Sequence, residues 1–302
     1  MKVSKRSTAT LDWFGCATFR LNVDGLTIFL DAYIDRIEGS DGPEGATADL
    51  ITECDYILIG HSHFDHIWGA ETIAKNTGAK IIGSYESIRM MAAEGVPEEQ
   101  LFPVAGGERI TLSENVTLHV FPMLHSCLLE AYNDTEPDVA CLTAHNYEYF
   151  EERVILSTFS EKIAQLGEAV KNHLEQSRQG ARGDGGVLGF LLETPEGTLF
   201  FKDTMGHWTG ILEEIEADVA ILAISGRGNV DGEPIKGSLV DFMNREVAAL
   251  NCQRFIPCHH DNYLPGFATQ SNLPALKAGM LAKHPNLEFI VPNYVPGFEV
   301  FK

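Results

Sequence analysis

The sequence has no long hydrophobic run and no excess of basic residues. None of its apolar stretches approaches the length of about 18 residues that a transmembrane helix needs, so membrane insertion is not expected. The formal net charge is −21, with 22 lysines and arginines against 43 aspartates and glutamates. This balance argues against a nucleic acid or an anionic membrane as the main partner. The start MKVSKRSTATLDWFG is basic but lacks an apolar core, so no secretory signal is expected there.

Cysteine is sparse, and its spacing excludes one common kind of zinc site. The six cysteines contain no Cys-x-x-Cys pair, which argues against a zinc knuckle. So few thiols are typical of a reducing compartment rather than of a disulfide scaffold, and we therefore expect a cytoplasmic protein. A small-molecule substrate is the expected partner, and the sequence leaves homo-oligomerisation open.

Strand and helix patterns alternate in both halves of the chain, which predicts a layered α/β fold. Apolar segments such as ATFRLNV, LTIFLD, DYILIG and ADVAILAIS are typical of strands. The segments SIRMMAAEG, SLVDFMNREVAALN and LPALKAGMLAKHP predict helices, and a further helix is expected from about His66 to Asn76, ending at Gly78. Two hairpins are expected, one from GGERITL with NVTLHVFPM and one from VLGFLLET with TLFFKD.

The pattern changes between residues 126 and 186. Within this segment TFSEKIAQLGEAVKNHLEQSRQG has apolar residues at helical spacing, with Thr158 and Glu161 as a candidate capping box. A segment of about 60 residues with one strong helix is a thin basis for an independent core. We therefore expect a single domain over residues 1–302, in which residues 126–186 form an inserted helical cap over the active site.

The stretch GHSHFDHIWG places four potential metal ligands directly after the buried strand DYILIG. They are His61, His63, Asp65 and His66. Alternate residues of an extended segment point the same way, so His61 and His63 can share one metal. A turn after them would direct Asp65 and His66 toward a second metal. Imidazole and carboxylate together suit zinc, iron or manganese.

Three more potential ligands stand where predicted strands end. His125 follows LHVFPML, Asp203 follows GTLFFK, and His259 follows RFIPC. An isolated histidine at a strand end is more often non-catalytic. Together with the H-x-H-x-D-H motif, however, these three residues would supply the ligands that two metal sites still need, because strand ends hold side chains in fixed positions.

These segments resemble the metallo-β-lactamase superfamily of metal-dependent hydrolases, except over residues 126–186. HSHFDH matches the hallmark motif, and WFGCATFRL followed by LTIFLD resembles the opening strands, with Asp31 at the strand end. FKDTMG resembles the later Gly-Asp-Thr-Gly turn, with Lys202 in place of the first glycine and Met205 in place of a small residue. IPCHH resembles the terminal Pro-x-His. Within the superfamily the chain looks most similar to the branch of the ascorbate-6-phosphate lactonase and the N-acylphosphatidylethanolamine phospholipase D.

The resemblance implies a four-layer αβ/βα sandwich with two divalent metal ions at one edge of its two sheets. Zinc is the expected metal, with manganese and iron as alternatives. By position, one ion would be held by His61, His63 and His125, the other by Asp65, His66 and His259, and Asp203 would bridge them. His260 competes with His259 as the last ligand. The Pro-x-His pattern favours His259 and leaves His260 either as a residue that supports a metal ligand or as a substrate contact.

The implied activity is cleavage of a lactone, ester or phosphodiester bond by a metal-bridging hydroxide. Asp65 and Asp203 would be the catalytic residues, orienting the hydroxide or passing a proton to the leaving group. One alternative is an iron-dependent oxidoreductase on the same fold, although the sequence contains no fused flavodoxin-like or rubredoxin-like segment. The other is a non-catalytic binding protein that its metals stabilise, against which the complete ligand set argues.

Substrate contacts are less visible in the sequence. Arg227 and Asn229 in the loop SGRGNVDGEPIKGS would bind an oxyanion, unless this loop is only a glycine-rich connector. His145 in TAHNYEYF would reach the cavity from the cap, unless it only packs the cap itself. His207 follows the Asp203 turn and would line the pocket.

The remaining histidines and two cysteines are interpreted as structural. His119 lies within a predicted strand, and His173 and His284 lie in helical or loop context. Cys127 and Cys258 stand near expected ligands in the sequence, but buried thiols of this kind are usually inert.

Overall fold

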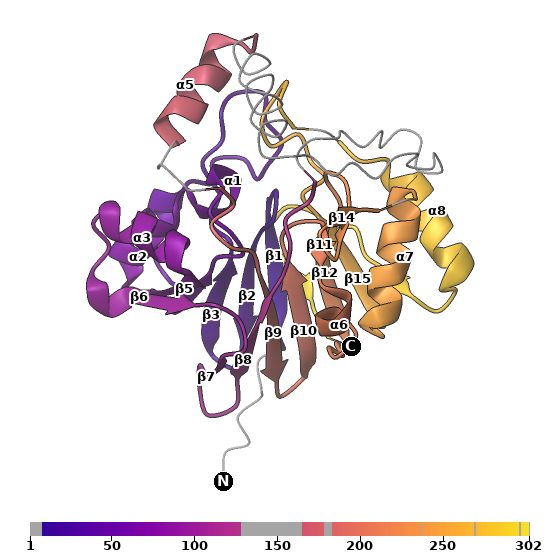
Figure 1. Ribbon diagram of the computed structural model, residues 1–302. Helices are drawn as coiled ribbons and strands as arrows, with labels where there is room; N and C mark the ends of the chain where they lie inside the picture. The colour runs from indigo at the N-terminus through magenta and orange to yellow at the C-terminus, as the bar shows by residue number, and fades with distance from the viewer. Residues whose placement is uncertain are drawn as a thin grey trace.

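The strands of the protein form two seven-stranded sheets and one small three-stranded sheet (Figure 1). The computed structural model describes residues 8–127, 165–177, 183–235, 237–268, 270–295 and 297–301. The first sheet contains, in spatial order, β17 (Phe298–Glu299), β1 (Thr10–Gly15), β2 (Thr18–Val23), β3 (Leu26–Leu30), β4 (Tyr56–Leu58), β5 (Lys80–Ser84) and β6 (Leu101–Val104). The second contains β16 (Glu288–Phe289), β15 (Arg254–Cys258), β12 (Val219–Ala223), β10 (Gly197–Lys202), β9 (Leu188–Thr194), β8 (Thr117–Pro122) and β7 (Arg109–Thr111). The third consists of β11 (Gly206–His207), β13 (Asn229–Val230) and β14 (Glu233–Pro234).

Helices lie on the outer sides of the two large sheets. Figure 1 shows α2 and α3 beside the first sheet and α7 and α8 beside the second. The described helices are α1 (Phe64–Ile67), α2 (Ala70–Thr77), α3 (Tyr85–Ala93), α5 (Glu168–Ser177), α6 (Thr209–Leu212), α7 (Leu239–Ala249) and α8 (Leu273–Lys283), with single 3₁₀ turns η1 (Ala48–Leu50) and η2 (Glu98–Gln100).

Both large sheets are buried on two faces because their central strands carry apolar residues at successive positions. In β3, Ile28 and Leu30 face the core between the sheets, whereas Phe29 packs beneath α2 and α3. In β10, Leu199 faces the same central core and Phe200 packs beneath the helices of the second sheet. The layers therefore run helices, sheet, sheet, helices, in agreement with the expected α/β architecture.

The carboxyl ends of the parallel strands meet at one edge of the sandwich. In the first sheet β3, β4 and β5 are parallel, and in the second sheet β10, β12 and β15 are parallel. Parallel strands end at the same side of a sheet, where ligands of α/β proteins usually bind. Asp31 and Gly60 follow the first sheet's strands at this edge, and Asp203 and His259 follow those of the second.

Two helix predictions need correction. The helix expected from His66 to Asn76 is broken into α1 and α2, because Gly69 has φ 122° and a Cβ there would lie 2.5 Å from the carbonyl oxygen of Ala32. Within residues 126–186 the structure describes α5, which begins only at Glu168, since residues 165–167 are not helical. The rest of the proposed cap, including Thr158 and Glu161, lies outside the described residues.

Two further properties concern the described residues only. None of their helices is long and apolar enough to cross a membrane. Their five cysteines, Cys16, Cys54, Cys127, Cys252 and Cys258, are free thiols.

Candidate metal centre

The H-x-H-x-D-H motif occupies the turn between β4 and α1. His61 and His63 lie on the extended segment after the strand, and His63 has the extended backbone of a helix N-cap. Asp65 and His66 lie on α1, where the Asp65 carboxylate meets His259 and the His66 ring lies 4.0 Å from the His61 ring, centroid to centroid. The four side chains thus enter two adjoining donor clusters, and His61 and His66 lie side by side where these clusters meet.

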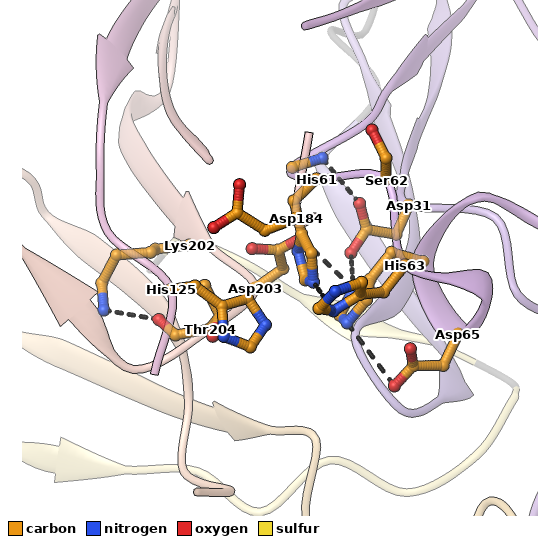
Figure 2. A network of polar contacts seen from close by, with 12 residues as sticks. Asp31, His61, Ser62, His63, Asp65, His125, Asp184, Lys202, Asp203 and Thr204 are labelled. Carbon is orange, nitrogen blue, oxygen red and sulfur yellow. Dashed lines mark hydrogen bonds and ion pairs between the residues drawn. The ribbon is translucent and has the colours of Figure 1, made fainter. Parts of the chain in front are cut away.

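His61 and His63 meet His125 in a three-histidine cluster. Nε2 of His61 lies 3.0 Å from Nδ1 of His63, and the His125 ring centroid lies within 4.8 Å of both other rings. One ring nitrogen of each lies within 4.8 Å of those of the other two. Figure 2 shows these side chains drawn together from separate segments of the chain. Three imidazole nitrogens facing one point form a donor set that divalent zinc binds well.

A second cluster contains Asp65, His66 and His259. Oδ2 of Asp65 lies 3.1 Å from Nε2 of His259 and 3.6 Å from Nε2 of His66. The structure adds the thiol of Cys16 to this set, with all four ligand atoms within 4.8 Å of one another. Nitrogen, oxygen and sulfur donors at this spacing can hold a second cation.

Carboxylates orient the histidines of both clusters. Oδ2 of Asp203 lies 2.7 Å from Nδ1 of His61, and Oδ2 of Asp31 lies 2.7 Å from Nδ1 of His66. Each Nδ1–H that donates to a carboxylate leaves Nε2 with its lone pair directed into the cluster. Such carboxylate–histidine pairs fix the tautomer and ring orientation of metal ligands.

Asp203 lies where the two clusters meet. Its Oδ2 contacts His61 and lies 3.2 Å from Nδ1 of His66. Its Oδ1 is buried and has no hydrogen-bond partner among the described residues. A buried carboxylate oxygen without a partner is costly, and a cation held by these residues would satisfy it. The donor set therefore fits the two divalent ions that the sequence predicts.

Glycine at position 60 allows the Asp203 carboxylate to lie close to the backbone of the H-x-H-x-D-H segment. A Cβ on Gly60 would collide with the carboxylate of Asp203. The Gly60 N–H donates to Oδ1 of Asp31 at 2.9 Å, and its carbonyl oxygen accepts from the Leu188 N–H at 2.8 Å. The residue that precedes the motif thus connects the two sheets through its backbone.

Left-handed backbone conformations are concentrated at the site. Only six non-glycine residues of the described chain have positive φ, and three of them are Cys16 (49°), Asp31 (52°) and His259 (60°). The Cys16 and His259 turns are joined, because the His259 N–H donates to the Cys16 carbonyl oxygen at 2.8 Å. Unusual backbone at two donors of one cluster, and at the carboxylate that orients a third, is typical of functional sites.

Burial keeps the three-histidine cluster neutral. It lowers the pKa of His61 to about 4, although Asp203 opposes the shift. Burial and the neighbouring His61 lower the pKa of His63, and burial lowers that of His125. Neutral imidazoles carry the lone pairs that a metal needs, so these three residues need not lose a proton before they bind one.

His66, in contrast, lies among carboxylates that favour a positive charge. Burial alone would lower its pKa, but Asp65, Asp203 and Asp31 outweigh burial and raise the pKa to about 10. Burial and the charge of Asp203 raise the pKa of Asp31 to about 8. Burial would raise the pKa of Asp203 as well, but His61 and His66 outweigh it and lower that pKa. The surroundings of His66 thus stabilise a cation, which is a proton when no metal is present.

Comparisons with known proteins agree with this geometry. Residues 27–143 match the sequence profile of the β-lactamase superfamily domain. A protein named UPF0173 metal-dependent hydrolase from Pyrobaculum neutrophilum is 36% identical over 114 residues, which make up 38% of this chain and 49% of that protein. The chain thus spans about half the length of the curated relatives that it matches.

Two solved structures share the fold along almost the whole chain. Igni18, described as a novel metallo hydrolase from Ignicoccus hospitalis, has a TM-score of 0.62 at 17% identity and covers 98% of this chain and 100% of its own. YhfI, a metallo-β-lactamase fold protein from Bacillus subtilis, has a TM-score of 0.54 at 8% identity and covers 97% and 99%. The chain has the metallo-β-lactamase fold. Residues 27–143 are similar to the β-lactamase superfamily domain, whereas membership of the superfamily and of the narrower branch suggested by the sequence stays a prediction.

In this metallo-β-lactamase fold the two oxyanion candidates support other residues. The Asn229 side chain donates to the carbonyl oxygen of His125 at 2.9 Å, so it holds the backbone of a candidate ligand. Arg227 is buried, its Nη2 donates to the Ile235 carbonyl oxygen at 3.3 Å, and its own carbonyl oxygen accepts from the Cys127 N–H. Neither contact requires a substrate, and the oxyanion role of both residues stays a prediction.

The other substrate candidates differ in how close they lie to the clusters. His260 follows His259, but its ring stacks on Trp13 with centroids 4.8 Å apart, and burial lowers its pKa to about 4. His207 is buried and lies 2.8 Å from Oε1 of Glu246. His145 lies outside the described residues. Between the two terminal candidates, the structure brings His259 into the donor cluster and places His260 against the sheet core.

Sequence reasoning missed two residues that contact Asp65. The Cys16 Sγ lies 3.9 Å from Oδ2 of Asp65, at a turn between β1 and β2. The hydroxyl of Tyr263 also hydrogen-bonds Asp65, and burial followed by the Asp65 charge raises its pKa, so this hydroxyl stays protonated and donates. A cysteine beside glycine in the strand-linking stretch FGCA was the only sequence signal for Cys16. No spacing rule points to Tyr263.

Proposed function

We propose that this protein is a metal-dependent hydrolase with a two-metal centre that cleaves a lactone, ester or phosphodiester bond of a small molecule. The observation that carries the proposal is the convergence of two donor clusters at Asp203, from strand ends of both sheets. The similarity to a relative named as a metal-dependent hydrolase supports the same reading. Zinc is the preferred metal because imidazole nitrogens dominate the donor set.

Bound divalent ions would supply two effects at this position, polarisation of a carbonyl or phosphoryl oxygen and a lowered pKa of water. The side chains of the protein would bind these two ions and determine the side from which the substrate reaches them. His61, His63 and His125 would hold one ion, and Asp65, His66 and His259 the other. His63 and His125 are partly exposed, whereas His61, His66 and Asp203 are buried. We therefore expect the substrate to approach from the side of His63 and His125.

Two aspartates are positioned to handle protons. Asp203 Oδ1 has no partner among the described residues and can bind an ion or hold a proton close to the reacting bond. Oδ2 of Asp65 is engaged by His259, while the Tyr263 hydroxyl donates to the same carboxylate. Both carboxylates are engaged through Oδ2, but Asp203 has an Oδ1 without a partner among the described residues, so we assign proton transfer to Asp203 and orientation to Asp65.

Metal analysis combined with a hydrolysis screen tests the proposal. The purified protein, its chelator-treated form and the zinc-reloaded form would be assayed on lactones, phosphodiesters and thioesters. We expect activity on at least one class, its loss with the metal, and its return on reloading. Full activity of the metal-free protein would refute the proposal.

Two variants sharpen this screen. His61→Ala should abolish turnover and reduce bound metal, whereas His119→Ala should retain both. His119 is a suitable control because its ring lies on β8 beside Arg109 and Glu193.

Visible spectroscopy of the isolated protein tests the iron-dependent oxidoreductase alternative. Bound iron with redox-active bands and without hydrolysis would favour that alternative. Two bound ions without turnover of any substrate class would favour the non-catalytic alternative.

A further inference from the structure

The second donor cluster contains a thiol. Cys16 is fully buried, and its Sγ, the Asp65 carboxylate, and ring nitrogens of His66 and His259 all lie within 4.8 Å of one another. Three of these four residues are candidate ligands on grounds independent of the cysteine, because two belong to the H-x-H-x-D-H motif and the third follows β15. Cys16 therefore enters a cluster that already has the composition of a metal site.

Three donor separations in this cluster are close to those around a tetrahedral ion. With metal–nitrogen and metal–oxygen bonds near 2.0 Å and a zinc–sulfur bond near 2.3 Å, neighbouring donors of a tetrahedral zinc site lie about 3.3–3.5 Å apart. From Oδ2 of Asp65 the observed distances are 3.1 Å to His259 Nε2, 3.6 Å to His66 Nε2 and 3.9 Å to Cys16 Sγ. Shifts of a few tenths of an ångström would bring all three distances to those values.

The backbone fixes the thiol in this position. The Cys16 N–H donates to Oδ1 of Asp261 at 3.0 Å, and its carbonyl oxygen accepts from the His259 N–H at 2.8 Å. The same carbonyl oxygen accepts from Nε1 of Trp13 at 3.1 Å. The turn that carries Cys16 is thus tied directly to the residue that supplies another donor of the cluster.

We propose that Cys16 is a fourth protein ligand of the second cation, together with Asp65, His66 and His259. The inference rests on the proposed two-metal centre and adds one ligand to it. Counting the bridging Asp203, the second cation would then have five protein donors and the ion of the three-histidine cluster four, so the latter would be the more open of the two. The substrate oxygen would therefore be bound at the three-histidine cluster. The sulfur donor would also favour zinc over manganese or magnesium at the second position.

Cobalt(II) tests this assignment without an activity assay. Bound cobalt gives visible ligand-field bands, and a thiolate ligand adds a sulfur-to-metal charge-transfer band in the near ultraviolet. The protein loaded with cobalt should show both features. Cys16→Ser should keep the ligand-field bands, lose the charge-transfer band, and release the second ion to a chelator at least about tenfold more readily.

Cys258→Ala is the matched control, because Cys258 is also fully buried and adjoins His259 but is not a member of the donor cluster. It should keep both spectral features.

If Cys16→Ser does not fold, X-ray absorption of the zinc-loaded Cys258→Ala protein tests the assignment instead, and sulfur is expected at about 2.3 Å from zinc. Ligand-field bands without a charge-transfer band, or a zinc shell of nitrogen and oxygen alone, would overturn the Cys16 assignment and leave the metal centre intact. Failure to bind cobalt or zinc at all would overturn both.

Discussion

Oδ2 of Asp203 lies 2.7 Å from Nδ1 of His61, although 142 residues separate the two in the sequence. Asp203 directly follows β10 of the second sheet, and His61 follows β4 of the first. Both side chains are buried, so the contact is a direct polar connection between the two halves of the sandwich. The candidate metal centre and the packing of the two sheets are thus linked at one carboxylate.

Replacing Asp203 by Asn tests the importance of the negative charge of Asp203, because the shape of the side chain is nearly preserved. The amide is nearly isosteric, but it removes the negative charge that His61 and His66 face. We expect metal affinity to fall at least about tenfold and turnover to fall with it. Metal content by mass spectrometry and chelator competition measure the effect. Asp49→Asn, at an exposed position, should change neither quantity, and an unaltered metal content in Asp203→Asn would contradict the bridging role.

Gly60→Ala should disrupt the contact between Asp203 and His61 sterically. Its Cβ would occupy the position of the Asp203 carboxylate, so the two sheets would have to move apart or Asp203 would have to turn away. We expect a lower melting temperature together with reduced metal content. Gly210→Ala is the control, since a Cβ there meets no atom within 4 Å and lies in α6. That substitution should be neutral or stabilising by up to about 1 kcal/mol. Equal melting temperatures for both variants would show that the close approach at Gly60 is unimportant.

The sequence was sufficient to predict the parts of the site that local patterns encode. Alternation in an extended segment places His61 and His63 on the same side, and strand ends place Asp203 and His259 at one edge. These relations follow from strand geometry. The structure brings the seven candidate metal ligands into adjoining clusters, and their role in binding metal stays a prediction.

Tertiary packing determines the parts that the sequence could not reveal. Cys16 reaches Asp65 because its turn is held by Asp261, which lies 245 residues later. The helix expected from His66 to Asn76 breaks because Gly69 packs on the backbone of Ala32, whereas the helical pattern of the side chains continues through the break. Neither contact leaves a periodic signal in the sequence.

The stability of the metal-free protein should fall as the pH rises from about 7 to 10. The folded-state pKa of His66 is raised to about 10, above its ordinary value of 6.5, so the folded protein binds the proton more tightly than the unfolded chain. This stabilisation is fully present below pH 6.5 and is lost as the pH rises through about 10. The pKa of Asp31 is raised to about 8, and this shift also lowers the stability of the folded protein as the pH rises to about 8.

Urea denaturation of the chelator-treated protein at several pH values from 7 to 10 measures this effect. The midpoint should fall across the series, and His66→Gln should flatten the dependence. Added zinc displaces the His66 proton, so zinc affinity should rise with pH over the same range. A midpoint that is constant or rises from pH 7 to 10 in the metal-free protein would show that His66 is not held in its charged form.

Lys202 and Glu246 form a buried ion pair beneath the Asp203 turn. Their side chains are fully buried, Nζ of Lys202 lies 2.8 Å from Oε1 of Glu246, and it also donates to the Thr204 carbonyl oxygen at 2.8 Å. Figure 2 shows Lys202 and Thr204 on the strand end that carries Asp203. Burial opposes the charge of Glu246, but Lys202 and His207 outweigh it and lower its pKa. The lysine that stands in place of a glycine in this turn is therefore paired and not a loose surface charge.

Lys202→Met should consequently destabilise the protein by about 3–5 kcal/mol, because it leaves the buried Glu246 carboxylate without its cation. The double variant Lys202→Met with Glu246→Leu removes both charges and should recover part of this loss, although His207 then loses its carboxylate partner. Urea denaturation of the metal-loaded proteins gives the free energies of unfolding. The exposed pair of Lys283 and Asp241, 3.4 Å apart, is the control, and Lys283→Met should change the free energy by no more than about 1 kcal/mol. A loss for Lys202→Met as small as that of the control would mean that the carboxylate of Glu246 is neutralised by His207 or by a proton, and that Lys202 does not support the turn.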